Sequence, residues 1–443
     1  MTTRHPPGTE LRWPDSVPTL IDPERRVLLR AHRPADVPRV VEMCTDPEFV
    51  RWTTTPHPYR IADATSFIND FVPNEVDTGR SMIWAIEAID TASAAAGGTA
   101  QFCGSVEIRL QDDGRGEIAF GLHPDARAQG LLRRAGRLAL DWAFDVAGLQ
   151  AVVWRAKVGN WGSRHAAAAL GFRFEGVRRA EMNQRGELVD SWTATVLADD
   201  PRTSVAPPRQ PTLHRDGVVL RPFQDRDVPR IVEACADPIS QYWLAALPRD
   251  YSVEHAKGFV ELGREGAAIF DQWIWCITTA GDPDAGPASD GRAAEPANQL
   301  GDQRFKGLVP DECLGAISIR GLADGSEAGE LGYWTHPAAR GRGLTSAAAR
   351  VLADFALGET ARTEVDTAGG NTEQTAAGVA EGMPDADPLL RSLMIRVAIG
   401  NPASQAVARR TGARLIGCFP QTEQLGDGTW TDLLAYTRVR GTG

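Results

Sequence analysis

At 443 residues the chain exceeds the size of one ordinary hydrophobic core, so we expect two or three domains. Its 42% apolar and 24% charged residues are typical of a soluble globular protein, and no run of about 18 apolar residues is present to span a membrane. The net charge of −11 argues against a nucleic-acid partner, because such affinity depends largely on Lys and Arg that neutralise phosphates.

The first 15 residues lack the hydrophobic segment of a signal peptide, so we expect a cytoplasmic protein. The six cysteines include no C-x-x-C pair, which favours reduced, mostly buried thiols. The eight histidines show no metal-ligand spacing, and we predict no structural or catalytic metal. No G-x-x-x-x-G-K-[S/T] segment occurs, which excludes a P-loop nucleotide triphosphatase.

Beyond an expected tail at residues 1–22, the sequence repeats itself once. Residues 29–42 recur as residues 220–233, 191 positions later, and in both copies the apolar residues fall at i, i+3, i+4 and i+7. This spacing predicts a strand followed by an amphipathic helix in each copy. Residues 116–124 recur as residues 329–337, by which point the offset has grown to 213.

A further growth of the offset locates insertions in the second copy. The motif Asn160-x-x-Ser163 recurs as Asn401-x-x-Ser404, 241 positions later, so the second copy is expected to carry insertions of 22 and then 28 residues. Segments rich in Gly, Pro, Asp and Ala lie near 280–312 and 366–388. We predict surface loops there, with a substrate lid as the alternative.

We therefore predict two domains, residues 23–198 and 216–443, joined by a proline-containing linker at 199–215. Each domain is expected to run strand, helix, second helical segment, three strands, helix, strand, helix and two strands, so that one α/β domain is built twice. In the first domain we expect central strands at 82–88, 102–110 and 116–123, a helix at 130–146, and later strands at 151–156, 172–179 and 188–196.

The stretch from residue 329 to residue 358 carries the strongest functional pattern. Residues 329–337 read as a strand, and helical spacing of apolar residues begins near Leu344, after two arginines and two glycines at 340–343. Glycine permits positive φ and a close approach of the backbone, while a helix start offers unpaired N–H groups. The segment therefore predicts a pyrophosphate cradle to which both arginines add positive charge.

This stretch resembles the Arg/Gln-x-x-Gly-x-Gly/Ala signature of GNAT acyltransferases, with Thr345 where Gly or Ala is usual. Each half resembles the RimJ/RimL-like branch of this superfamily. In the second half the matching motifs are Leu-Arg-Pro-x-x-x-x-Asp at 220–227, Gly-Glu-Leu-Gly-Tyr-Trp at 329–334 and Asn-Pro-Ala-Ser at 401–404. The first half has altered counterparts of these motifs. The resemblance covers nearly the whole chain. It implies an α/β protein of two tandem GNAT (acyl-CoA N-acyltransferase) folds, each with a mixed, mostly antiparallel central sheet flanked by helices.

The resemblance implies transfer of an acyl group, usually acetyl, from coenzyme A to a primary amine. The strand at 330–336 would pair with the pantetheine amides and the cradle would hold the diphosphate. Asn401 is expected to contact the donor or to cap the following helix. The expected cofactor-binding residues are Trp334, Thr335, His336, Arg340, Gly341, Arg342, Gly343, Leu344, Thr345, Ser346 and Asn401.

Two side chains are the candidate catalytic residues. An amine is mostly protonated at neutral pH, so a base must remove its proton. Glu330 is the candidate base, through a water, with an ordinary surface carboxylate as the alternative. Many GNAT enzymes carry a tyrosine beyond the Asn motif, but none lies between Asn401 and Phe419. Ser404 is therefore the candidate proton donor to the leaving thiolate, with helix capping as the alternative. A backbone N–H near Trp334 is expected to stabilise the oxyanion that forms during attack.

The first half carries a possible second cofactor site at Arg127, Gly130, Asn160 and Ser163. Its cradle has Ala128 in place of Gly341 and Leu132 in place of Thr345. We expect the added side chain to restrict the loop and the leucine to crowd the helix start, so that catalysis lies in the second half and the first is degenerate or binds donor weakly.

Three functions are compatible with the sequence. The first is acetyl-CoA-dependent N-acetyl transfer to a small-molecule amine or a peptide N-terminus, by direct attack without a cysteine intermediate. The second is a transferase with a longer acyl donor or a hydroxyl acceptor, and the third is a non-catalytic acyl-CoA-binding pseudoenzyme. We expect either a monomer whose halves pack as a pseudo-dimer or a homodimer.

Overall fold

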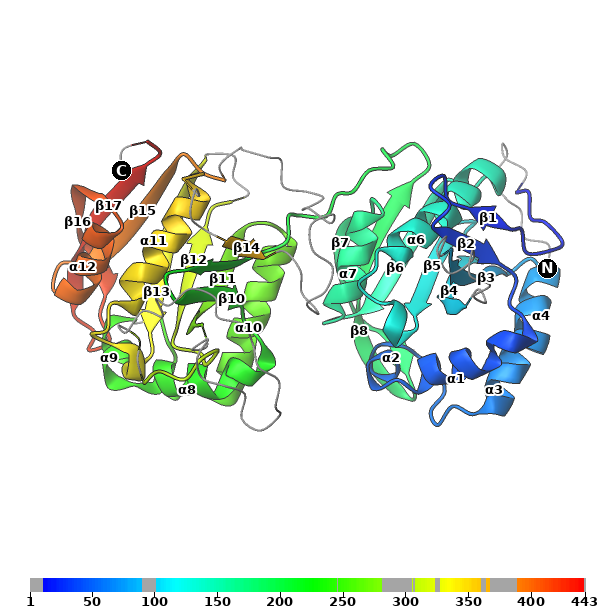
Figure 1. The fold of residues 1–443 in the computed structure, drawn as a ribbon, viewed down its shortest axis with the longest axis horizontal. Coiled ribbons are helices and arrows are strands. Elements are labelled where there is room, and N and C mark those ends of the chain that lie inside the picture. Colours follow the sequence, from blue (N-terminus) through cyan, green and yellow to red (C-terminus); the bar gives the residue numbers. More distant parts are fainter. Residues whose placement is uncertain are drawn as a thin grey trace, which may run out of the picture. The chain divides into compact units, whose positions relative to one another are not determined.

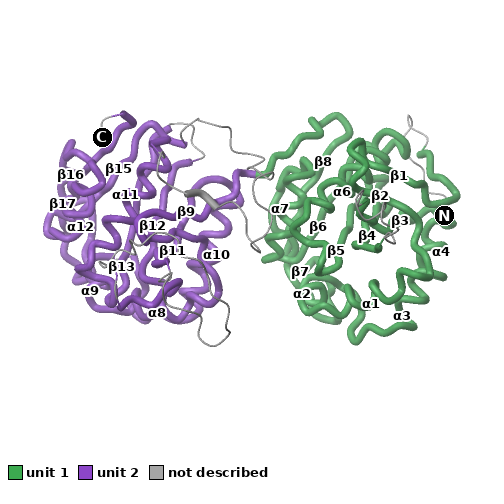
Figure 2. Tube along the Cα trace, viewed as in Figure 1, with its two compact units in different colours: residues 1–206 green, residues 207–443 purple. Residues whose placement is uncertain are grey.

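The computed structural model describes residues 11–89, 101–244, 246–280, 305, 307–322, 327–359, 364–366 and 389–441. The chain divides into two compact units, Met1–Ala206 and Pro207–Gly443 (Figure 2). Each unit is an α/β domain built around one sheet (Figure 1). The expectation of one α/β fold formed twice is confirmed.

The sheet of unit 1 has eight strands in the order β1-β2-β3-β4-β5-β6-β8-β7. Neighbouring strands are antiparallel except for β5 and β6, which are parallel. The strand bounds are β1 Leu20–Ile21, β2 Val27–Arg30, β3 Ser81–Ala88, β4 Phe102–Leu110, β5 Gly116–Leu122, β6 Ala151–Lys157, β7 Arg173–Gln184 and β8 Glu187–Leu197.

Helices cover both faces of this sheet (Figure 1). A large apolar cluster packs between the sheet and α6, and a smaller one packs beneath α1 and α3. The helical segments are η1 Pro34–Asp36, α1 Val37–Thr45, α2 Pro47–Trp52, α3 Ile61–Ser66, η2 Phe67–Phe71, α4 Val72–Asp77, η3 Pro124–Ala126, α6 Leu131–Asp141, η4 Trp142–Val146 and α7 Trp161–Ala169.

Unit 2 repeats this arrangement with nine strands in the order β14-β9-β10-β11-β12-β13-β15-β17-β16. Its one parallel pair is again the central one, between β13 and β15. Its strands are β9 Thr212–Arg215, β10 Val218–Pro222, β11 Gln272–Thr279, β12 Gly315–Arg320, β13 Ala328–Thr335, β14 Glu364–Asp366, β15 Ser392–Ala398, β16 Arg414–Gln424 and β17 Trp430–Val439.

The helices of unit 2 follow the same plan. The largest apolar cluster lies between the sheet and α11, and a second cluster lies between the sheet and the pair α8 and α10. The helical segments are η5 Asp225–Asp227, α8 Val228–Ala236, α9 Pro238–Trp243, α10 Val253–Ala268, η7 Pro337–Ala339, α11 Leu344–Ala356 and α12 Pro402–Arg410.

Several expected boundaries differ from the structure. Part of the expected tail at 1–22 packs on unit 1, because β1 pairs with β2 and the ring of Trp13 lies edge-on against Trp142. The expected linker at 199–215 is shared between the units: Arg202 forms ion pairs with carboxylates of α6 and η4, and β9 joins the sheet of unit 2. Most of both expected insertions lies outside the described residues.

The repeated Leu-Arg-Pro-x-x-x-x-Asp motif forms a buried ion pair. In unit 2, the guanidinium of Arg221 on β10 donates two hydrogen bonds of 2.8 Å to the carboxylate of Asp227, which begins α8. Unit 1 repeats the pair as Arg30 and Asp36. All four residues are less than 9% exposed, so neither charge has water as an alternative partner. The pair fixes the first strand to the first helix in each unit.

The burial of this pair predicts an unequal effect of two neighbouring substitutions. Asp227→Asn removes the buried carboxylate partner of Arg221 and leaves that buried charge with Asp311, whose side chain is half exposed. We expect the substitution to lower the free energy of unfolding by about 3 kcal/mol. The matched control Asp225→Asn breaks a solvent-exposed ion pair with Arg264, and we expect a loss below about 1 kcal/mol. Urea denaturation of the full chain measures both, and equal losses would contradict the prediction.

Candidate active site

The central cleft of unit 2 forms where two parallel strands separate. Pairing between β13 and β15 covers three residue pairs and ends at Glu330, opposite Met394. The N–H of His336 donates to Leu314 beside β12 at 2.9 Å. Because backbone groups alternate in direction along a strand, the amide groups of Tyr333 and Thr335 face the opening on the β15 side.

This alternation refines the expected oxyanion donor. The amide of Trp334 has the same direction as that of His336 and therefore faces β12. The nearby backbone N–H groups directed toward the cleft belong to Tyr333 and Thr335.

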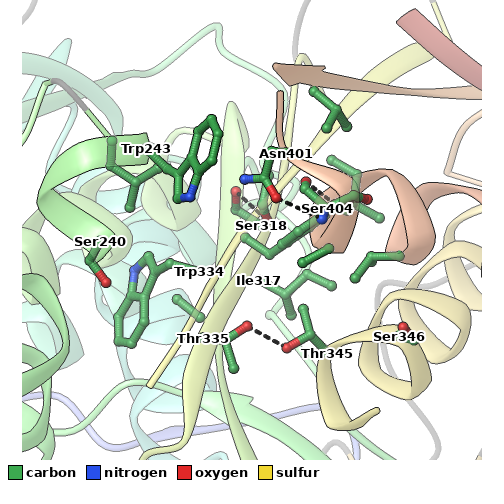
Figure 3. Close-up of a pocket in the computed structure, with 18 of the residues that line it drawn as sticks. Ser240, Trp243, Ile317, Ser318, Trp334, Thr335, Thr345, Ser346, Asn401 and Ser404 are labelled. Carbon is green, nitrogen blue, oxygen red and sulfur yellow. Dashed lines mark hydrogen bonds between the residues drawn. The ribbon is translucent and has the colours of Figure 1, made fainter. Parts of the chain in front are cut away.

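A cavity of about 650 Å³ occupies this cleft and is lined from both faces of the sheet. Figure 3 shows Ser240 and Trp243 of α9 on one side, and Thr345 of α11 and Ser404 of α12 on the other. Trp334 of β13 lies on the same side of the cavity as Ser240 and Trp243. The cavity thus has two separate approaches to the same strand, which suits a reaction between two substrates.

The turn before α11 has the backbone conformation that its glycines predict. Gly341 and Gly343 have φ of +74° and +76°, and a Cβ at either position would meet nothing within 4 Å. Glycine is therefore required for its backbone angles and not for space. Gly343 is the N-cap residue of α11, and no side chain of the described residues caps this helix. Its first amide groups consequently remain available to an anion in the cavity.

A hydrogen bond fixes this helix start to the cleft strand. The hydroxyls of Thr335 and Thr345 lie 2.5 Å apart (Figure 3). Leu344, Thr345 and Ser346 are buried in the protein, and all three line the cavity. The threonine that departs from the usual signature therefore joins the strand to the helix.

Arg340 has a partner within the protein. Its guanidinium donates to Asp237 at 2.6 Å and to Ser240 at 2.9 Å, while Asp237 also caps α9. Partial burial tends to raise the pKa of Asp237, but the hydrogen bond from Arg340 lowers it, and the net pKa is below its ordinary value. Arg340 thus fixes the glycine turn to α9, and much of its charge is balanced by Asp237. Arg342 is exposed and does not line the cavity.

His336 also has a structural position. Its Nδ1 accepts a hydrogen bond from the N–H of Ala338 at 3.1 Å, and its Nε2 lies 3.2 Å from Glu233. Burial lowers the pKa of His336, which favours the neutral ring that this acceptor role requires. The residue is 4% exposed and lies outside the cavity lining, so it shapes the turn from behind.

Glu330 lines the cavity but is not a free carboxylate. The guanidinium of Arg396 on β15 donates to both of its oxygens, at 2.9 and 2.7 Å, and this contact raises the pKa of Arg396. A carboxylate held in such a fork has two of its lone pairs occupied. Any proton acceptance by Glu330 therefore requires a further lone pair or a shift of Arg396.

Ser404 stands at the first turn of α12. Asn401 caps this helix, since its Oδ1 accepts the N–H of Ser404 at 3.0 Å, as Asn160 does for Ser163 in unit 1 at 3.1 Å. The hydroxyl of Ser404 is instead paired with that of Tyr333 at 2.7 Å. Asn401 and Ser404 both line the cavity.

Several cavity residues were not predicted from the sequence. Tyr333 is not among the predicted site residues, because the family pattern places its tyrosine after the Asn motif. Its alternation with Thr335 nevertheless places both side chains on one face of the strand. Trp243, Ser318 and Arg396 also line the cavity. No local pattern marks them, because each comes from an element that only the sheet order brings to the cleft.

Unit 1 retains the turn but changes the side chains around it. Arg127 donates to Asp46 at 2.7 Å, as Arg340 does to Asp237. Ala128 has φ of +61° and Gly130 has +73°, so the loop takes the same left-handed conformation as in unit 2. The alanine takes this conformation at a cost of about 1–2 kcal/mol, and the expected effect of Ala128 on donor binding stays a prediction.

The part of the chain that the structure describes contains no group of three His, Cys, Asp or Glu side chains arranged to hold a metal ion. Within the same part, every helix is too short or too polar to cross a bilayer. Five of the six cysteines are buried, and Cys418 is exposed.

A family model described as "Acetyltransferase (GNAT) domain" matches residues 26–173 and again 218–414. The ribosomal-protein-serine acetyltransferase of Escherichia coli (strain K12) is 28% identical over 131 residues, which cover 29% of this chain and 56% of that protein. The chain therefore spans little more than half the length of this curated relative.

Solved structures with similar folds include Mycobacterium smegmatis RimJ in complex with CoA-disulfide, at 21% identity and a TM-score of 0.36 over 44% of this chain and 92% of that one. The microcin C7 self-immunity acetyltransferase MccE, in complex with acetyl-CoA and AMP, is 16% identical with a TM-score of 0.34 over 39% and 92% of the respective chains. The family model matches most of both units, and the chain belongs to the GNAT acetyltransferase family, with one GNAT domain in each unit.

Proposed function

We propose that the chain is an acetyl-CoA-dependent N-acetyltransferase that modifies the primary amine of a small molecule or a peptide N-terminus, and that unit 2 carries out the reaction. The observation that carries this proposal is the separation of β13 from β15 directly beside an uncapped helix start. The first feature offers strand-like pairing to the amides of a pantetheine arm. The second offers N–H groups to a diphosphate.

The donor would lie along the α11 and α12 side of the cleft. Its diphosphate would meet the turn from Gly341 to Ser346, and its amides would pair with the backbone of Tyr333 and Thr335. This arrangement brings the thioester close to Ser404. Arg340 supports the turn through Asp237, and the helix amides supply most of the attraction for the phosphates.

The acceptor amine would enter from the α9 side, past Trp243 and Trp334. Glu330 would take the amine proton through a water, since it is the carboxylate that lies where the two strands separate. The nitrogen then attacks the thioester carbonyl and the C–N bond forms. The nitrogen loses its second proton to water, and the C–S bond breaks with its electron pair on sulfur. The N–H of Tyr333 or Thr335 would stabilise the oxyanion.

The side chains of unit 1 favour catalysis in unit 2. At the positions of Thr335 and Thr345, unit 1 has Leu122 and Leu132, so the hydrogen bond between strand and helix is replaced by apolar groups. In unit 1 the ring of Phe49 lies so close to Gly121 that a Cβ there would clash. The equivalent residues of unit 2 are Ser240 and Trp334, both of which line the cavity.

A thiol-release assay with acetyl-CoA and a panel of amines tests the function. The panel should include short peptides with free N-termini, because the E. coli relative is named for a ribosomal-protein substrate. Amine-dependent release of CoA supports the proposal. Binding of acetyl-CoA without release from any amine would favour the non-catalytic alternative, and release only with longer acyl donors or alcohols would favour the other transferase.

The glycine turns predict which unit binds the donor. Gly343→Ala forces an alanine to φ near +76° at the proposed diphosphate site, and we expect the affinity for acetyl-CoA to fall about tenfold. The matched substitution Gly130→Ala imposes the same strain in unit 1 at φ near +73° and should leave that affinity unchanged. Calorimetry on the full chain measures both, and equal weakening would assign donor binding to both units.

The position of Glu330 predicts a selective loss of turnover. Glu330→Gln removes the proposed base, and we expect kcat to fall by about 10²–10⁴-fold with little change in the KM for acetyl-CoA. The control Glu327→Gln alters an exposed carboxylate that precedes the same strand and pairs with Arg391. It should retain wild-type kcat. Turnover of the Glu330 variant within threefold of wild type would show that another group accepts the proton.

A further inference from the structure

Two hydroxyl groups meet at the donor side of the cavity. Tyr333 of β13 and Ser404 of α12 lie 71 positions apart in sequence, and their hydroxyl oxygens are 2.7 Å apart. The Tyr333 hydroxyl also lies 3.0 Å from the carbonyl oxygen of Ser404, which can only accept. Tyr333 therefore has two possible acceptors on one residue, and Ser404 Oγ faces the cavity beside Asn401 (Figure 3).

In unit 1 the counterpart serine accepts a hydrogen bond from a side chain at a different position. Ser163, the counterpart of Ser404, lies 3.0 Å from the indole Nε1 of Trp154. An indole N–H is a donor only, so Ser163 Oγ must accept and its own proton remains available to another acceptor. Phe120 occupies the position of Tyr333, and Ile395 occupies that of Trp154. Each unit thus has a different side chain in contact with the same serine hydroxyl.

We propose that Tyr333 is a positioning residue that donates to Ser404 Oγ and so directs the Ser404 proton toward the sulfur of the leaving thiolate. This inference rests on the proposed function. The Ser404 N–H is already bonded to Asn401, so the hydroxyl is the group of this residue left for the substrate. Ser404 also stands in the first turn of α12, where the helix dipole favours a nearby negative charge.

The pair stabilises the thiolate by hydrogen bonding, and no proton moves along it. Burial raises the pKa of Tyr333 to about 12, whereas a thiol has a pKa near 8.5. Transfer of the tyrosine proton to the thiolate is therefore unfavourable. The C–S bond breaks with its electron pair on sulfur, both hydroxyl protons stay in place, and solvent protonates the thiolate after release.

Binding of free CoA and of desulfo-CoA, which lacks the sulfur, tests this role without any acceptor. Calorimetry at pH 7 and pH 9 compares a mostly protonated thiol with a largely ionised one. For the wild-type chain we expect the affinity for CoA, relative to that for desulfo-CoA, to rise about tenfold from pH 7 to pH 9. The reason is that the hydrogen bond from Ser404 then has a charged acceptor. Tyr333→Phe should lose most of this gain while binding desulfo-CoA as wild type does.

Two further variants complete the experiment. Ser404→Ala should lose the same gain, and the double variant should resemble it, because Tyr333 acts through Ser404. The control Tyr251→Phe removes a phenol hydroxyl that contacts Cys235 away from the cavity and should keep the wild-type gain.

The outcomes separate this inference from the proposed function. An unchanged sulfur-dependent gain in Tyr333→Phe, or equal weakening of both ligands, would overturn the role of Tyr333 while leaving the acetyltransferase proposal standing. A wild-type chain that binds CoA without any such gain would also overturn it. Failure of the wild-type chain to bind either ligand would overturn the proposed function and this inference together.

Discussion

The separation of β13 from β15 after Glu330 is the constraint on which the site depends. Up to that residue the two strands satisfy each other's backbone groups, and beyond it the amide groups of Tyr333 and Thr335 lose that partner. Unpaired backbone groups require water or a ligand. The separation also opens both faces of the sheet to one cavity, so that elements on opposite faces, α9 and α12, line the same space.

The two units share a scaffold and differ at the cleft. The buried Arg–Asp pair, the Asn cap and the left-handed turn recur with closely similar geometry, although Ala128 stands where Gly341 does. These features fix strands to helices in each unit. Unit 1 has leucines where unit 2 has Thr335 and Thr345, and a phenylalanine where unit 2 has Tyr333. These differences change the chemistry offered to a ligand and leave the scaffold intact.

The charged side chains of the signature act mainly within the protein. Arg340 contacts Asp237, and His336 contacts the backbone of η7 and Glu233. Because both are tied to neighbouring elements, they hold the turn in the form that its positive-φ glycines allow. In the proposed site, the attraction for an anion comes chiefly from the backbone N–H groups at the start of α11, whose direction is fixed by the helix itself.

The sequence by itself determined the duplication, the order of strands and helices, the glycine turn and the helix that follows Asn401. These are local properties, since they depend on residue spacing and on φ angles that neighbouring residues set. Only the tertiary structure decided that Tyr333 meets Ser404 and that Arg396 holds Glu330, across 71 and 66 positions of sequence. Such contacts depend on which strands become neighbours and on where they separate, and that order is set by packing of the whole sheet against its helices.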